Sequence, residues 1–177
     1  VFQSYASNLV SSDSNNFADI FFRDRQIGST ERVSVSSTGV EGNANSSFAS
    51  LSADGRYVAF VSLASNLVLD DTNNFSDVFV HDRQTGSTER VSLSSTGVEG
   101  NSNSSYTAIS ADGRYVAFSS FASNLVPDDT NGQGDVFVRD RQTGSTERIS
   151  ISTAAIEGNN QSYVPTLSAD GRYVAYL

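Results

Sequence analysis

The stretch Leu51–Phe60, which reads L-S-A-D-G-R-Y-V-A-F, decides the fold of this chain. It places Asp54-Gly55 between two apolar runs. This is the strongest short-range signal for a tight β-hairpin turn, because glycine adopts the positive φ that the turn needs. The stretch therefore predicts the end of one strand, a turn and the start of a second strand. It returns at 109–118 and at 167–176, a step of 58 residues from 51 to 109 and from 109 to 167.

The residues that follow this stretch repeat with the same period and predict four strands in each unit, at about 49–53, 56–62, 77–82 and 88–94. The second strand is apolar at every position from Tyr57 to Val61, which indicates a strand that is covered on both faces. Glycine, serine and asparagine interrupt the sequence too often for helices. Self-similar units of this kind are typical of propellers and solenoids, and four-stranded antiparallel sheets packed face to face are propeller blades. We therefore predict an all-β fold of β-propeller blades, built from three 58-residue repeats and open at both ends.

The register of the repeats predicts an incomplete first blade. One repeat domain is expected over 1–177, with units at about 1–50, 51–108 and 109–166 and a surplus strand pair at 167–177. Val1-Phe2 falls at the register of Ala59-Phe60, so the first unit lacks its first strand and the front of its second. Closed propellers have four to eight blades, and an open strand edge pairs with other chains unless it is blocked.

The C-terminal strands are therefore expected to complete the first blade of another chain, by β-strand addition in trans. The residues predicted to form this joint are Val1, Phe2, Leu167, Tyr173, Val174, Ala175, Tyr176 and Leu177. Such a contact is head-to-tail, so it gives a six-bladed ring if it closes after two chains and a filament if it does not close. A cut from a longer run of the same repeats is a third alternative, and the sequence does not distinguish the three.

The composition narrows the classes of function. The chain has 177 residues, no cysteine, no methionine and a formal net charge of −9. Disulfides, thiol catalysis and thiolate metal sites are excluded, and the negative charge disfavours nucleic acid and anionic membranes as partners. No apolar run approaches the length of a membrane span. The acidic composition, rich in serine and asparagine, is compatible with a secreted protein.

The loop between the second and third strands is the best candidate site. Its three copies share the spacing D-x-N-x-x-x-D, and carboxylate, amide and carbonyl oxygens are the ligands that Ca²⁺ prefers. The candidate ligands are Asp13, Asn15, Asp19, Asp71, Asn73, Asp77, Asp129, Asn131 and Asp135. The alternative interpretation is that Asp and Asn only cap their own turns through bonds to the backbone. No other cofactor is expected.

The remaining polar motifs predict architecture rather than catalysis. Asp54 is expected to accept turn N–H groups, and Arg56 to pair with an acid such as Asp82 across the strands. His81 is the only histidine and stands where the other units have arginine, so we expect a solvated residue at a strand edge. No serine is marked as a nucleophile beside a histidine and an orienting acid, so no catalytic residue is assigned and no enzymatic activity is expected.

Two segments of the repeat carry a resemblance to a known family. S-x-D-G-R-x-V-A-F at 52–60, followed by D-V-F-V-x-D-R-x-T-G-x-T-x-R-V-S at 77–92, resembles the TolB-type β-propeller repeat. The resemblance covers essentially the whole chain, although the loops at 63–76 and 95–107 are longer than in the common pattern. It implies a non-catalytic binding or scaffolding domain in the periplasm or outside the cell, in a bacterial source.

These observations leave two functions open. The first is an extracellular structural protein that assembles with itself. The second is a propeller module that binds a protein or glycan ligand, or Ca²⁺, through its acidic loops.

Overall fold

A computed structural model describes all residues from 1 to 177 and contains strands, turns and loops only. Three sheets follow one another along the chain, and we call them blades 1, 2 and 3. Blade 1 consists of β1 (Phe2–Ser4), β2 (Asp19–Asp24) and β3 (Ser29–Arg32). Blade 2 consists of β4 (Ser46–Leu51), β5 (Tyr57–Ser62), β6 (Asp77–Asp82) and β7 (Ser87–Arg90). Blade 3 consists of β8 (Ser104–Ile109), β9 (Tyr115–Ser120), β10 (Asp135–Asp140) and β11 (Ser145–Arg148).

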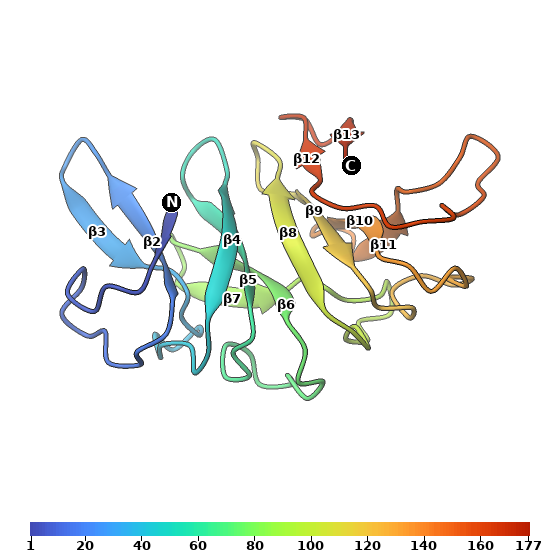
Figure 1. Cartoon of the computed structure of the whole chain (residues 1–177). Coiled ribbons are helices and arrows are strands. Elements are labelled where there is room, and N and C mark those ends of the chain that lie inside the picture. The colour runs from blue at the N-terminus through green and yellow to red at the C-terminus, as the bar shows by residue number, and fades with distance from the viewer.

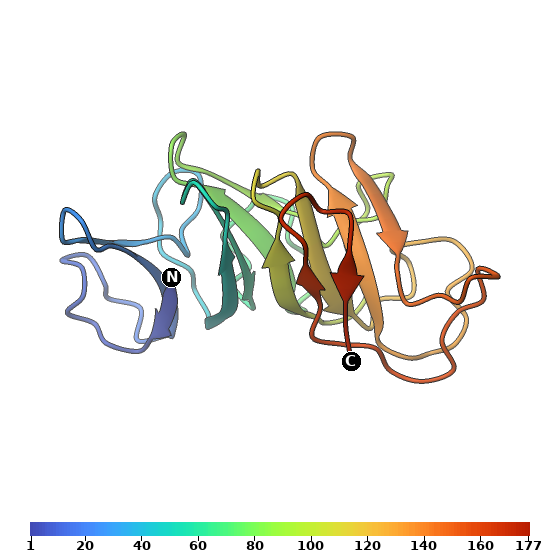
Figure 2. The ribbon, with the colours of Figure 1, turned by 90° about the horizontal axis from the view of Figure 1, so that it is seen from above.

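A two-stranded C-terminal hairpin of β12 (Thr166–Leu167) and β13 (Val174–Ala175) follows blade 3. The blades stand side by side in chain order, and the hairpin lies beside blade 3 as the inner half of a fourth blade (Figures 1 and 2). All pairings within the sheets are antiparallel and join consecutive strands. The predicted β-propeller architecture, open at both ends, is therefore confirmed. None of the elements is a helix that could cross a membrane.

The strand boundaries agree with the prediction best in the middle of the blade. The third strand of blade 2 was expected at 77–82, and β6 has those bounds. The first strand, expected at about 49–53, begins earlier at Ser46 and contains a bulge between Ser47 and Ser50. Phe48 has a φ of 50° at this bulge, which lets the strand bend and continue its pairing with β5.

The fourth strand was expected at 88–94, but β7 already ends at Arg90. The Arg90 side chain enters a cluster of acidic residues at this end of the strand. Beyond Arg90, the Val91 N–H still donates to the Val78 carbonyl over 2.8 Å, and an isolated bridge joins Leu93 to Glu99 in the following loop.

The stretch around Asp54-Gly55 forms the expected hairpin connection between β4 and β5. Gly55 has a φ of 74°, and its N–H donates to the Ser52 carbonyl over 3.0 Å. The Asp54 carboxylate accepts the Arg56 N–H over 3.0 Å and the Ser52 hydroxyl over 2.6 Å. The aspartate therefore holds the turn as predicted, with glycine in the left-handed conformation.

The hydrophobic core lies between the blades rather than within one of them. Phe60 and Phe79 of blade 2 are fully buried and pack on Ile20 and Val33 of blade 1. One period later, Phe118 and Phe137 of blade 3 are in one cluster with Val61, Val78 and Val80 of blade 2. Each blade therefore presents one face to the blade before it and the other face to the blade after it, so both faces need a neighbour.

Candidate functional site

The acidic loop of each unit surrounds an arginine, which is not among the residues predicted for this site. In blade 2, Nη1 of Arg90 lies 3.3 Å from Asp71, 3.2 Å from Asp77 and 2.9 Å from Glu99. Only 7% of the Arg90 side chain is exposed. The guanidinium thus occupies the centre of the predicted cation site, and we call this arrangement the arginine cluster.

The same cluster occurs in the other two units, with Arg32 and Arg148 at its centre. Arg32 lies 3.3 Å from Asp13, 3.3 Å from Asp19 and 2.8 Å from Glu41. Arg148 lies 3.2 Å from Asp129, 3.5 Å from Asp135 and 2.9 Å from Glu157. A repeat of this fidelity indicates a role in the architecture of every unit.

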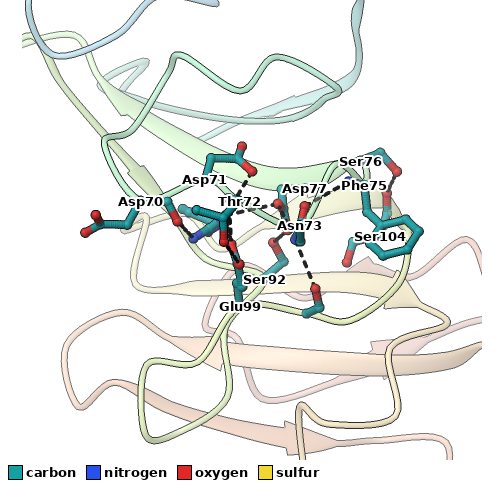
Figure 3. A network of polar contacts seen from close by, with 12 residues as sticks. Asp70, Asp71, Thr72, Asn73, Phe75, Ser76, Asp77, Ser92, Glu99 and Ser104 are labelled. Atoms are coloured by element: carbon teal, nitrogen blue, oxygen red, sulfur yellow. Dashed lines mark hydrogen bonds and ion pairs between the residues drawn. The ribbon is translucent and has the colours of Figure 1, made fainter.

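The asparagine of the D-x-N-x-x-x-D motif serves the loop itself (Figure 3). Nδ2 of Asn73 donates to Asp77 over 3.0 Å and to the Gly100 carbonyl over 2.9 Å, while Oδ1 accepts the Phe75 N–H over 2.8 Å. Asn15 and Asn131 make the corresponding contacts in their own loops. The structure therefore brings the predicted aspartates together, while the amide oxygen is engaged by the backbone.

No group of three or more acidic or histidine side chains is arranged to hold a metal ion. Calcium binding by these loops stays a prediction. The arginine could have been identified from the sequence, because it occurs in every unit as Arg-x-Ser. In every unit it is also followed nine residues later by the glutamate of Glu-Gly-Asn. Buried carboxylates need a counter-charge, and this arginine is the one that every unit supplies.

Burial changes the ionisation of these carboxyl groups. Desolvation, with the nearby charges of Asp77 and Glu99, raises the pKa of Asp71 to about 6 against the opposing effect of Arg90. Burial likewise raises the pKa of Asp77 and of Asp129. Because three carboxylates share one guanidinium, the cluster holds an excess of negative charge.

The expected pair of Arg56 and Asp82 is confirmed. Nε and Nη2 of Arg56 donate to the two carboxylate oxygens over 2.9 and 2.6 Å, a bidentate contact that ties the start of β5 to the end of β6. These bonds hold the pKa of Asp82 well below its usual range. Arg114 and Asp140 repeat the contact in blade 3 with the same distances.

The expectation for His81 was wrong, because this residue is buried in the middle of a sheet rather than solvated at an edge. It lies on β6, between β5 and β7, with 7% of its surface exposed. Its Nδ1 lies 2.9 Å from the Thr88 hydroxyl. Desolvation lowers the pKa of His81.

A second recurring contact joins consecutive blades at the hairpin end. The turn at Gly113 of blade 3 packs on the Tyr57 ring of blade 2, so closely that a Cβ there would lie 2.1 Å from the ring. Arg141 lies over the same ring at 4.5 Å and donates to Glu89 of blade 2 over 2.6 Å. Arg83 makes the corresponding contacts with Phe22 and Glu31 of blade 1.

Comparison with solved structures agrees with this arrangement of blades. TolB from Acinetobacter baumannii is 20% identical with a TM-score of 0.55, and the match covers 94% of this chain and 33% of that chain. The putative TolB from Agrobacterium tumefaciens is 19% identical with a TM-score of 0.52, and the match covers 93% of this chain and 52% of that chain. The chain has a TolB-like β-propeller fold.

The same fold recurs in other structures as one part of a longer chain. A prolyl endopeptidase is 14% identical with a TM-score of 0.56, and the match covers 90% of the TolB-like chain and 22% of the endopeptidase. At these identities the likeness concerns the fold alone. No family model and no curated protein matches the sequence.

The predicted joint residues lie at the two ends of the TolB-like chain. Phe2 stacks on Phe21 at 5.8 Å between ring centroids, as Phe60 does on Phe79 at 5.9 Å, yet 40% of Phe2 is exposed. At the other end, Tyr176 is 39% and Leu177 71% exposed. Val1 and Tyr173 are also exposed, Leu167 and Val174 pair with each other in the hairpin between β12 and β13, and Ala175 pairs with Thr166.

Proposed function

We propose that this chain is a non-enzymatic structural module whose copies join head-to-tail through their blade faces. One observation carries the proposal. The chain builds the same inter-blade interface twice and leaves apolar residues at the corresponding positions exposed at each end, namely Phe2 at the N-terminal end and Tyr176 and Leu177 at the C-terminal end.

The N-terminal end presents the face that a preceding blade covers. Phe2 and Leu9 of blade 1 correspond to Phe60 and Leu67 of blade 2, which are buried against blade 1. Phe2 is exposed and Leu9 is half-buried, while Phe21, the counterpart of Phe79, is already buried and stacks on Phe2. Nothing within the chain covers Phe2 in this way. An exposed apolar face of this kind needs an apolar partner. The face of blade 3 that is turned away from blade 2 belongs to the same repeat and is its natural partner.

The C-terminal end presents the face that a following blade covers. Val136 and Val138 of blade 3 correspond to Val78 and Val80, which pack on Phe118 and Phe137 of the next blade. Both valines are already buried in the single chain, and Tyr176 and Leu177 are among the apolar residues that stay exposed at this end. The C-terminal hairpin supplies the first strand of that next blade and the front of its second strand. The third and fourth strands are those that blade 1 of another copy contains.

The two ends also fit as parts of one strand. β13 covers the positions of Val58-Ala59, and β1 covers the positions of Phe60–Ser62. Placed end to end, β13 of one copy and β1 of the next reproduce most of β5. Tyr176 and Leu177 stand at the same positions of the repeat as Phe2 and Gln3. In the completed blade, Phe2 of the next copy therefore takes the position that Tyr176 has in the single chain.

Light scattering over a range of protein concentrations tests this proposal. We expect the mass to exceed the 18.9 kDa of one chain, and Phe2→Asp to return it to that value, because a charge on the joint face is not solvated there. Ile27→Asp is the matched control, since Ile27 is exposed at a hairpin tip away from both faces. A chain that stays monomeric at every concentration would refute head-to-tail association.

A second candidate function is ligand binding through the acidic loops, with Ca²⁺ as the ion. The excess of carboxylates over guanidinium groups in each arginine cluster supports it, because a divalent cation would neutralise that charge. Adding Ca²⁺ and then a chelator tests it through the melting temperature, which rises with any ligand that binds the folded state. No change at millimolar Ca²⁺ would exclude this function. We propose a location outside the cytoplasm for either function, in keeping with the acidic composition that is rich in serine and asparagine.

A further inference from the structure

Blades 1 and 2 are joined at the long-loop end by four hydrogen bonds, which we call the latch. The Asn43 N–H donates to Asn66 Oδ1 over 3.0 Å, and Asn43 Nδ2 donates to the Ser65 hydroxyl over 3.1 Å. In return, the Ser65 N–H donates to Asn43 Oδ1 over 3.0 Å, and Asn66 Nδ2 donates to the Glu41 carbonyl over 2.9 Å. Asn43, which follows blade 1, is thus hydrogen-bonded to both residues of the Ser65-Asn66 pair in blade 2.

The latch recurs one period later between blades 2 and 3. Asn101 takes the role of Asn43, and Ser123-Asn124 takes that of the Ser-Asn pair. The four distances are 3.0, 3.1, 2.9 and 2.8 Å. The geometry is therefore a property of the repeat and not of one loop.

Each latch lies beside a cavity that the following blade helps to line. The first cavity measures about 430 Å³ and is lined by Val40 from blade 1 and Leu67 from blade 2. The second measures about 440 Å³ and is lined by Val98 from blade 2 and Leu125 from blade 3. The leucine follows the Ser-Asn pair directly, so polar latch and apolar contact are made by one short segment.

Each end of the chain holds half of a third latch. Asn159 follows Glu157-Gly158 after blade 3, as Asn43 and Asn101 follow Glu-Gly, and its side chain has no hydrogen bond within the chain. The cavity beside it measures about 430 Å³ and is lined by Ile151, Ile156 and Tyr176. Ser7-Asn8-Leu9 in blade 1 repeats the Ser-Asn-Leu segment, and Ser7 and Asn8 are exposed.

We infer that Ser7 and Asn8 of a second copy close the latch on Asn159, while Leu9 enters the cavity lined by Ile151 and Ile156. This inference rests on the proposed head-to-tail association and names the contact that selects its partner. The apolar faces alone permit sliding, because hydrophobic contact is not directional. Hydrogen bonds that fit in only one register fix which blade follows which, and only a segment with the Ser-Asn-Leu order satisfies both halves.

The association constant of the full-length chain tests this inference, with Asn8→Ala and Asn159→Ala as the variants. Each variant removes two of the four bonds of the joint, so we expect the dissociation constant to rise about 10- to 100-fold. The double variant should associate more weakly than either single variant, because the side chains of Asn8 and Asn159 make two different bonds each. Asn66→Ala is the matched control, since it removes the same chemistry inside the chain and should lower the melting temperature without weakening association.

The outcomes separate this inference from the proposed function. If Asn8→Ala and Asn159→Ala associate as tightly as the parent chain while Phe2→Asp does not associate, the latch is refuted and head-to-tail association stands. If Asn66→Ala weakens association as much as Asn8→Ala and Asn159→Ala do, the loss reflects a general destabilisation of the chain and the latch is refuted as well. A parent chain that is monomeric at all concentrations refutes both.

Discussion

At the scale of single residues, Arg90 organises the acidic loop of its blade. A guanidinium is planar and always charged, and it donates up to five hydrogen bonds, so it can face several carboxylates at once. Arg90 also donates to the Asp70 carbonyl over 2.7 Å, which fixes the loop backbone as well as its side chains. The acids that suggested a calcium site are therefore also the natural surroundings of one buried arginine.

We predict that Arg90→Gln lowers the free energy of unfolding by about 3–5 kcal/mol, because it leaves buried carboxylates without their counter-charge. Denaturation with urea measures the change. Arg25→Gln is the control, since Arg25 is exposed, and its replacement should cost less than about 0.5 kcal/mol. A loss below about 1 kcal/mol in Arg90→Gln would show that the cluster does not stabilise the blade.

His81 gives a second prediction at this scale. Burial lowers the pKa of His81, with Glu31 and Asp82 raising it and Arg83 lowering it to a smaller extent. The unfolded chain therefore binds the proton more readily, and stability should fall as the pH drops through about 6.5. His81→Gln should remove this dependence.

The measurement compares the parent and His81→Gln by urea denaturation between pH 5 and 7.5. The difference between the two chains is needed because Asp71, with a pKa of about 6, titrates in the same range and has the opposite effect on stability. A difference that does not vary with pH would contradict the buried, neutral state of His81.

At the scale of elements, the hairpin turns do two things at once. Asp-Gly predicted the turn correctly, and the structure adds that the glycine of each turn also fits against an aromatic ring of the preceding blade. Gly113 has a φ of 75°, and a Cβ at this position would lie 2.1 Å from the Tyr57 ring. The glycine therefore serves both the local conformation and the contact between blades.

We predict that Gly113→Ala costs about 3 kcal/mol, which combines the penalty of a positive φ with overpacking against Tyr57. Gly97→Ala is a matched control, because Gly97 has a φ of 82° but no atom within 4 Å of the added Cβ. It should cost about 1 kcal/mol. Thermal unfolding of both variants gives the comparison, and equal losses would mean that the contact with Tyr57 contributes nothing.

The strands and loops also show how far the sequence alone could predict the structure. The bounds of β6 (Asp77–Asp82) were predictable because its apolar residues Val78, Phe79 and Val80 lie between two turn signals. The early start of β4 was not, because it depends on a bulge at Phe48, and nothing local distinguishes a residue of positive φ from its neighbours. The aspartates of the acidic loop were found because they are close in sequence. Their partner Arg90 was missed because it belongs to another strand, and only the fold brings the two together.

At the scale of the whole molecule, the repeat decides how the chain associates. Corresponding faces of the three blades are alike. A copy that docks on the C-terminal end of another therefore presents its own C-terminal end to a further copy. Growth stops only if the rotation between blades brings the last face back to the first. Two copies contain six blades when the split blade is counted once, which lies within the four to eight blades of known closed propellers.

We predict that the association closes into a ring of two chains. Phe2 of blade 1 and the exposed residues Ile151 and Ile156, which follow blade 3, then become buried in each copy. The mass by light scattering should reach a plateau at twice 18.9 kDa and stay there as the concentration rises, and electron microscopy should show discs. A mass that keeps growing with concentration, together with fibres in the images, would mean that the rotation does not close. In that case the same joint builds a filament. Phe2→Asp distinguishes either assembly from adventitious aggregation, because it should dissolve rings and fibres alike by blocking one half of every joint.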